Sequence, residues 1–124
     1  MSLRSLQPGD ILLVRFPEKQ PPGREQEGER PAVVVALPDC LGKPRFPMVL
    51  VLPLTTYRAQ PWAVSSPKLY PFLDAGAGKL NSPSTVLIDQ LCAVDQTRVR
   101  GYIGTLTPEQ FAPIRAGLKQ LFHE

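Results

Sequence analysis

Residues 23–35, GREQEGERPAVVV, join a polar loop to a run of valines. The segment that follows Pro31 is continuously apolar, which is typical of a strand buried on both faces. Residues 51–56, VLPLTT, form a second apolar run that ends in the hydroxyls of Thr55 and Thr56. Arg30 stands at the mouth of the first strand, so the cation there and the hydroxyls at the end of the second could together bind a phosphate.

Short strands separated by turn signals occupy most of the chain. Besides residues 31–37, strands are predicted at 11–16, 46–54, 85–91 and 98–106, with a shorter one at 62–65. Residues 17–30 and 68–83 are predicted as loops, because proline, glycine and polar residues interrupt them. Within the second loop, residues 76–80, GAGKL, lack the spacing of a phosphate-binding loop and are interpreted as flexible. This pattern favours a small β-barrel over an α/β sheet.

The period of the sequence changes after residue 106. Thr107 can cap a helix, Pro108 suits the first helical position, and Gln110 completes a capping box. An apolar face with helical spacing then follows, made of Phe111, Ile114, Leu118, Leu121 and Phe122. The sequence therefore predicts a C-terminal helix that packs on the barrel.

The composition is that of one globular domain, residues 1–124. The chain is 43% hydrophobic and 20% charged, with a net charge of +3. This basic excess is compatible with nucleic acid, and equally with an ordinary solvated surface. No apolar run approaches the roughly 18 residues of a membrane span, and residues 1–10 lack the apolar region of a signal peptide. We therefore expect a cytoplasmic protein without membrane association.

Several kinds of catalytic site are disfavoured by what the sequence lacks. His123 is the only histidine, and Cys40 and Cys92 lie far apart, which argues against a zinc site and a Ser–His–Asp hydrolase. Neither a Walker motif nor a dinucleotide fingerprint is present. We expect no metal site and no cofactor, so the remaining chemistry is that of arginine, carboxylates and hydroxyls.

Arg30 has two interpretations from the residues alone. Pro31 biases it toward extended geometry, so its guanidinium would project from the start of a central strand and could bind a phosphate through two hydrogen bonds. The alternative is a salt bridge within the loop to Glu25, Glu27 or Glu29.

The order of several short motifs resembles the MazF/PemK family of toxin endoribonucleases. These motifs are GDILLV at 9–14, GREQEGERP at 23–31, PLTT at 53–56, STVLIDQ at 84–90, and IGTL at 103–106 before the helix. The arginine loop is the specific element, and the others gain their significance from their order along residues 9–122.

The resemblance implies a mainly β fold, a small SH3-like β-barrel with a C-terminal α-helix, assembled as a homodimer. It also implies the toxin component of a type II toxin-antitoxin system, with a cognate antitoxin protein as partner. The activity would be metal-independent, sequence-selective cleavage of single-stranded RNA, usually mRNA. In that reaction the 2′-hydroxyl attacks the adjacent phosphorus and leaves a 2′,3′-cyclic phosphate and a 5′-hydroxyl.

Site residues follow from the same resemblance, position by position. Arg30 and Thr55 match the family's catalytic arginine and threonine, and Glu25 matches a loop carboxylate proposed as a helper. Since arginine stays protonated, Arg30 is assigned to charge stabilisation and is the candidate proton donor, and Glu25 is assigned to the role of base. The substrate-binding positions implied are Gln26, Thr56, Ser84 and Gln90.

Two other functions fit the same fold. One is a non-catalytic SH3-like barrel that binds a protein target, as gyrase-poisoning relatives do. The other is a barrel that binds nucleic acid without cleaving it. The pair Arg30 and Thr55 favours the endoribonuclease, because a protein binder would not need it.

Overall fold

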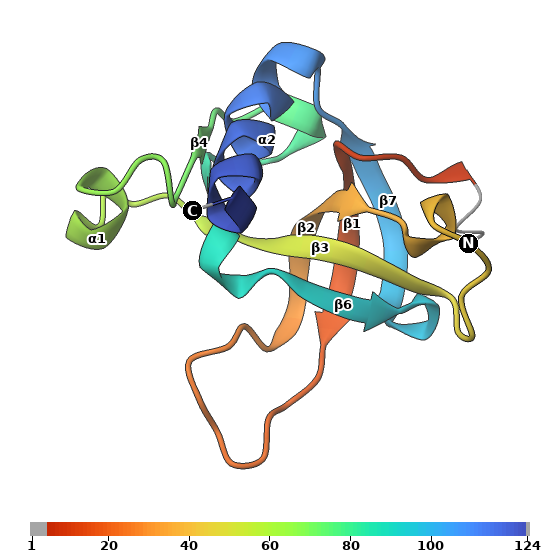
Figure 1. The fold of residues 1–124 in the computed structure, drawn as a ribbon. Coiled ribbons are helices and arrows are strands. Elements are labelled where there is room, and N and C mark those ends of the chain that lie inside the picture. The colour runs from red at the N-terminus through yellow and green to blue at the C-terminus, as the bar shows by residue number, and fades with distance from the viewer. Residues whose placement is uncertain (1–4, 124) are drawn as a thin grey trace.

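The computed structural model describes residues 5–123 as one antiparallel sheet with a helix at the C-terminus (Figure 1). The strand order is β4-β5-β3-β2-β1-β7, and β6 pairs with β3 outside this path. The strands are β1 (Asp10–Phe16), β2 (Gly28–Ala36), β3 (Met48–Thr56), β4 (Phe72–Leu73), β5 (Ser84–Val86), β6 (Cys92–Asp95) and β7 (Val99–Thr105). The fold class expected from the sequence is therefore confirmed.

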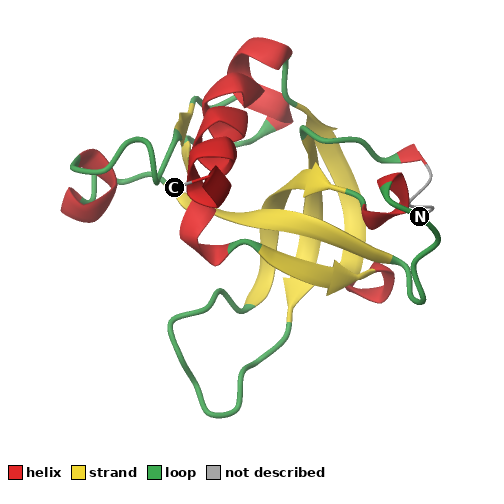
Figure 2. Ribbon diagram, viewed as in Figure 1, coloured by secondary structure: helices red, strands yellow, loops and turns green. Residues whose placement is uncertain are grey.

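Helices connect and cover the strands (Figure 2). The α-helices of the described residues are α1 (Pro61–Val64) and α2 (Pro108–His123). Short 3-10 turns within residues 5–123 include η2 (Pro38–Cys40), η3 (Ala77–Lys79), η4 (Ile88–Gln90) and η5 (Gln96–Arg98). None of the helices in the part of the chain described here is long and apolar enough to cross a membrane.

Helix α2 begins with the capping box expected from the sequence. The backbone N–H of Gln110 donates to Thr107 Oγ1 at 3.2 Å, and the N–H of Thr107 donates to Gln110 Oε1 at 2.9 Å. Two backbone donors that the first turn leaves without helical partners are thereby satisfied. Phe111 and Ile114 are the buried residues of α2, so this helix lays its apolar face on the sheet.

Strands β2 and β3 carry buried side chains on both faces, as their continuous apolar runs predict. Ala32 and Val34 belong to one core cluster with Val51, while Val33 belongs to another with Leu52. Register pairs Val33 with Leu52 and Val34 with Val51, so neighbouring residues of the two strands alternate between the clusters. The two strands therefore form the rigid centre from which the site is built.

The sheet is curved but does not close within residues 5–123. Strand β3 pairs with two different strands along one edge: its first half pairs with β6, and its last three residues pair with β5. The path ends at β4 on one side and at β7 on the other. Turn η3 lies against β7 at this opening, where a Cβ on Gly104 would stand 2.3 Å from the carbonyl oxygen of Gly78.

Three local predictions are wrong in the connecting segments. The strand expected at 62–65 is helix α1, whose first residue, Pro61, has the fixed φ that suits a helix start. The strand expected at 85–91 ends at Val86 and continues into turn η4. The loop expected at 68–83 contains β4 and η3, and its Ala77 and Gly78 are buried rather than free in solvent. Strand β6 was not predicted at all.

Candidate active site

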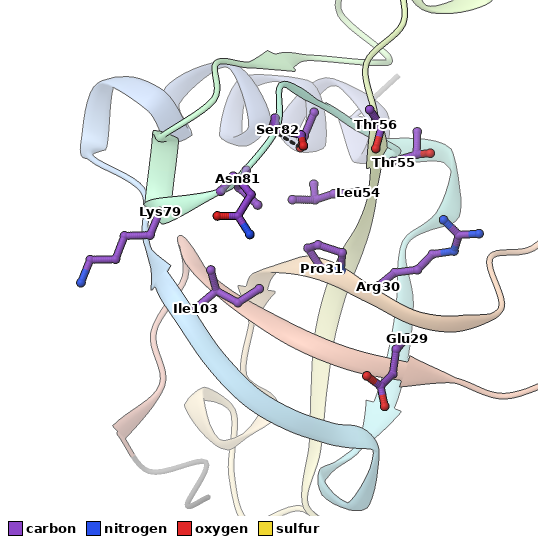
Figure 3. Close-up of a pocket in the computed structure, with 12 residues that line it drawn as sticks. Glu29, Arg30, Pro31, Leu54, Thr55, Thr56, Lys79, Asn81, Ser82 and Ile103 are labelled. Atoms are coloured by element: carbon purple, nitrogen blue, oxygen red, sulfur yellow. Dashed lines mark hydrogen bonds between the residues drawn. The ribbon is translucent and has the colours of Figure 1, made fainter.

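Arg30 and Thr55 come together because β2 and β3 are antiparallel. The register pairs Ala32 with Pro53, so the start of β2 lies beside the end of β3. Both residues line one cavity of 270 Å³, together with Thr56 and Ser84. Four of the seven site residues named from the sequence therefore share one hollow, which Figure 3 shows at close range.

Arg30 is half-buried and is held by the loop that precedes it. Its Nε donates to the backbone oxygen of Glu27 at 3.0 Å. The loop carboxylates are turned elsewhere: Glu27 Oε2 accepts from the N–H of Lys19 at 2.9 Å, and Glu29 Oε2 lies 3.9 Å from Arg100 Nε. Among the described residues no ion pair joins Arg30 to these acids. The guanidinium is thus positioned through Nε, while its two terminal nitrogens remain able to donate to an anion.

The hydroxyls at the end of β3 lie opposite those of β5. Register pairs Thr55 with Thr85 and Thr56 with Ser84. Ser84 is buried, and its Oγ donates to the carbonyl of Ser82 at 3.0 Å. Because its proton is already used, Ser84 fixes the shape of the 81–84 segment, and the hydroxyls of Thr55 and Thr56 are the better donors toward a ligand.

Glu25, Gln26 and Gln90 line a second hollow of 190 Å³, to which Pro53 also contributes. The Gln90 amide ties the 17–27 loop to η4, since its Oε1 accepts from the N–H of Gln26 at 2.8 Å and its Nε2 donates to the carbonyl of Arg24 at 3.0 Å. Gln26 Oε1 is buried without a hydrogen-bond partner among the described residues. The structure therefore does not bring Glu25 into the cavity of Arg30 and Thr55.

Several residues at the site were missed by the sequence analysis. Lys79, Asn81 and Ile103 line the cavity of Arg30, although they come from η3, the following loop and β7. Lys79 has a φ of 64°, an uncommon backbone conformation for a residue other than glycine. No local motif marks these residues, because the open edge of the sheet brings them together.

A tyrosine binds Asp89, one of the residues that line the second hollow. Tyr70 donates its hydroxyl to Asp89 Oδ2 at 2.7 Å, and its ring packs edge-to-face on Trp62 with centroids 4.8 Å apart. The hydrogen bond to Asp89 is the main reason that the pKa of Tyr70 is raised, and burial adds to it. The bond anchors the segment around α1 to η4, one residue before Gln90.

Within residues 5–123 no group of three or more His, Cys, Asp or Glu side chains is arranged to hold a metal ion. The polar groups that line the cavity are instead the guanidinium of Arg30, several hydroxyls and the amide of Asn81, with Glu29 and Lys79 as the other charged residues. Such a set can bind a phosphodiester and stabilise negative charge that develops on its oxygens.

Three solved structures are similar to this chain in fold. MazF (Form-I) from Deinococcus radiodurans is 20% identical, with a TM-score of 0.70 over 96% of this chain and 97% of that one. An endoribonuclease in complex with its cognate antitoxin from a Mycobacterial species is 16% identical, with a TM-score of 0.63 over 95% and 93% of the two chains. The Mycobacterium tuberculosis toxin MazF-mt6 is 21% identical, with a TM-score of 0.62 over 94% and 96%.

These likenesses show the fold, and the family follows from the sequence itself. No curated protein sequence matches the chain significantly. The profile of the PemK-like, MazF-like toxins of type II toxin-antitoxin systems, however, matches residues 7–122. The chain therefore belongs to the PemK-like, MazF-like family of type II toxins.

Proposed function

We propose that this chain is a metal-independent, sequence-selective endoribonuclease that cleaves single-stranded RNA at the cavity of Arg30 and Thr55. The observation that supports the proposal most is that these two residues line one cavity. Arg30 is held there through its Nε, and its two terminal nitrogens can still donate hydrogen bonds to the RNA. Membership in the toxin family and the endoribonuclease of similar fold support it as well.

The reaction requires three contributions from the protein: stabilisation of negative charge, a general base and a general acid. The 2′-hydroxyl oxygen forms a bond to the adjacent phosphorus while the bond from phosphorus to the 5′-oxygen breaks, which yields a 2′,3′-cyclic phosphate. Negative charge builds on the non-bridging oxygens, where Arg30 and the Thr55 hydroxyl donate hydrogen bonds. A base takes the proton of the 2′-hydroxyl, and an acid returns a proton to the 5′-oxygen.

Glu25 is the proposed base, and the geometry sets a condition on that role. A general base must come within about 2.6–3.2 Å of the proton donor or act through one water. Glu25 is exposed and lines the second hollow, with its carboxylate folded toward Gly23. In that role, either the 17–27 loop moves the carboxylate toward the RNA when substrate binds, or one water carries the proton between them.

The purified protein is expected to cleave long single-stranded RNA in the presence of EDTA. The physical reason is that the proposed charge stabilisation comes from a guanidinium and a hydroxyl, so no Lewis acid is needed. Incubation with RNA, followed by analysis of the product ends, should show cyclic phosphates and 5′-hydroxyls. A strict requirement for added magnesium or manganese would contradict the mechanism.

A homodimer and an acidic antitoxin segment are the partners that we propose. Exposed apolar side chains around α1 and β4, with Trp62 43% and Phe72 49% exposed, offer surface that a second copy could cover. A carboxylate of an antitoxin would bind Arg30 as a phosphate does. Light scattering should therefore give a dimer at micromolar concentration, and an added antitoxin segment should block cleavage in competition with RNA. A monomer, or a complex that cleaves at full rate, would contradict the respective part of this proposal.

A further inference from the structure

The cavity beside Arg30 has an apolar floor that the proposed chemistry does not use. Pro31, Leu54 and Ile103 line it from β2, β3 and β7 at the opening of the sheet. Figure 3 shows the Lys79 side chain extending away from this hollow, and Arg30 lying at its far edge. The third charged residue of the lining, Glu29, has its carboxylate 3.9 Å from Arg100 Nε, so the floor of the hollow is apolar and has room for one flat ring.

Asn81 is the polar side chain that reaches into this hollow. Figure 3 shows its amide on the side of the cavity that faces Leu54 and Pro31, above Ile103. Among the described residues the amide has no hydrogen-bond partner, and the residue is exposed. Its donor and its acceptor are thus both available to a ligand.

The loop that carries Asn81 is anchored on both sides. Before it, the carbonyl group of Gly78 packs so closely on Gly104 of β7 that a Cβ at Gly104 would clash with it. After it, the Ser84 hydroxyl donates to the carbonyl of Ser82 at 3.0 Å. An amide on an anchored loop can select a ligand by geometry, because little of the binding free energy is lost in ordering the loop.

We propose that this hollow binds one unpaired nucleobase of the RNA, next to the scissile phosphate, and that Asn81 selects adenine there. The proposal rests on the proposed function. A side-chain amide can accept from adenine N6 and donate to N7 at the same time, whereas the apolar walls cover the faces of the ring. Arg30 and Thr55 at the edge of the same cavity place the phosphate of that nucleotide within their reach.

The test is equilibrium binding of 2′-O-methyl RNA oligonucleotides, which cannot be cleaved, with one variable base in a uridine context. The wild-type chain should bind the adenine oligonucleotide about 5- to 150-fold more tightly than the others. Asn81→Asp removes the donor and leaves two acceptors, so the preference should move from adenine to guanine, which presents N1–H and N2–H₂. Asn81→Ala should bind all four oligonucleotides with similar affinity.

Gln120→Glu is the matched control, since it makes the same change from amide to carboxylate on the exposed surface of α2. Its base preference should equal that of the wild type, and melting curves should show that all variants are folded. Equal affinity of the wild type for the four oligonucleotides, or an unchanged preference in both Asn81 variants, would overturn the proposal. A preference for adenine without cleavage of ordinary RNA would instead uphold the base pocket and contradict the proposed function.

Discussion

Replacing Arg30 with alanine is expected to lower RNA cleavage by about 100- to 1,000-fold with little change in melting temperature. Loss of one preorganised donor to a transition-state oxyanion costs roughly 3–4 kcal/mol of activation free energy. The loss in free energy of unfolding is smaller, because Arg30 is half-buried and its one side-chain hydrogen bond within the described residues goes to the backbone of Glu27. Initial cleavage rates and thermal unfolding of the same preparations measure both effects.

Two variants sharpen this test. Arg30→Lys keeps the charge but loses the planar fork, so it should recover only part of the rate. Arg45→Ala removes a positive charge from the segment before β3, which lines neither hollow, and should leave the rate near that of the wild type. Thr55→Val should lower the rate less than Arg30→Ala does, since a neutral donor is weaker than a charged one. Near wild-type activity of both the Arg30 and Thr55 variants would show that the catalytic residues lie elsewhere.

The sequence predicted well what local chemistry dictates. The cap of α2 needs only Thr107, Pro108 and Gln110 in a row, and these residues form it as expected. The buried strands β2 and β3 likewise follow from runs of apolar residues that leave no polar face. The meeting of Arg30 and Thr55 was predictable because adjacent antiparallel strands bring the start of one to the end of the other.

The sequence failed where long-range packing decides the structure. Residues 76–80 were predicted to be a flexible loop, but they contain η3, which packs on β7 through Gly78 and Gly104. Glycine is common in loops, so its presence in the sequence does not indicate such a contact. Strand β4 has only two residues, which is too short for a sequence pattern. It is defined by its pairing with β5, in which Phe72 lies opposite Thr85. For the same reason the sequence could not assign Asn81 to the site. It also grouped Glu25 with Arg30 and Thr55, whereas Glu25 lines the second hollow.

The contact between Gly104 and Gly78 deserves a direct test, because it holds the loop of Asn81 against β7. A methyl group at Gly104 would lie 2.3 Å from the carbonyl oxygen of Gly78 and 2.7 Å from its carbonyl carbon. Both are backbone atoms, so no rotamer change can relieve the clash. Gly104→Ala is expected to destabilise the fold by about 1–3 kcal/mol, which corresponds to a melting temperature lower by roughly 3–15 °C.

Gly101→Ala provides the control on the same strand. A Cβ there meets no atom within 4 Å, so its effect on the free energy of unfolding should stay within about 0.5 kcal/mol. Gly104→Ala should also weaken the binding of RNA at temperatures where it remains folded, because η3 must move away from β7 and carry Asn81 with it. Equal melting temperatures of the two variants would show that η3 does not depend on this contact, and the anchoring of the Asn81 loop would then rest on Ser84 alone.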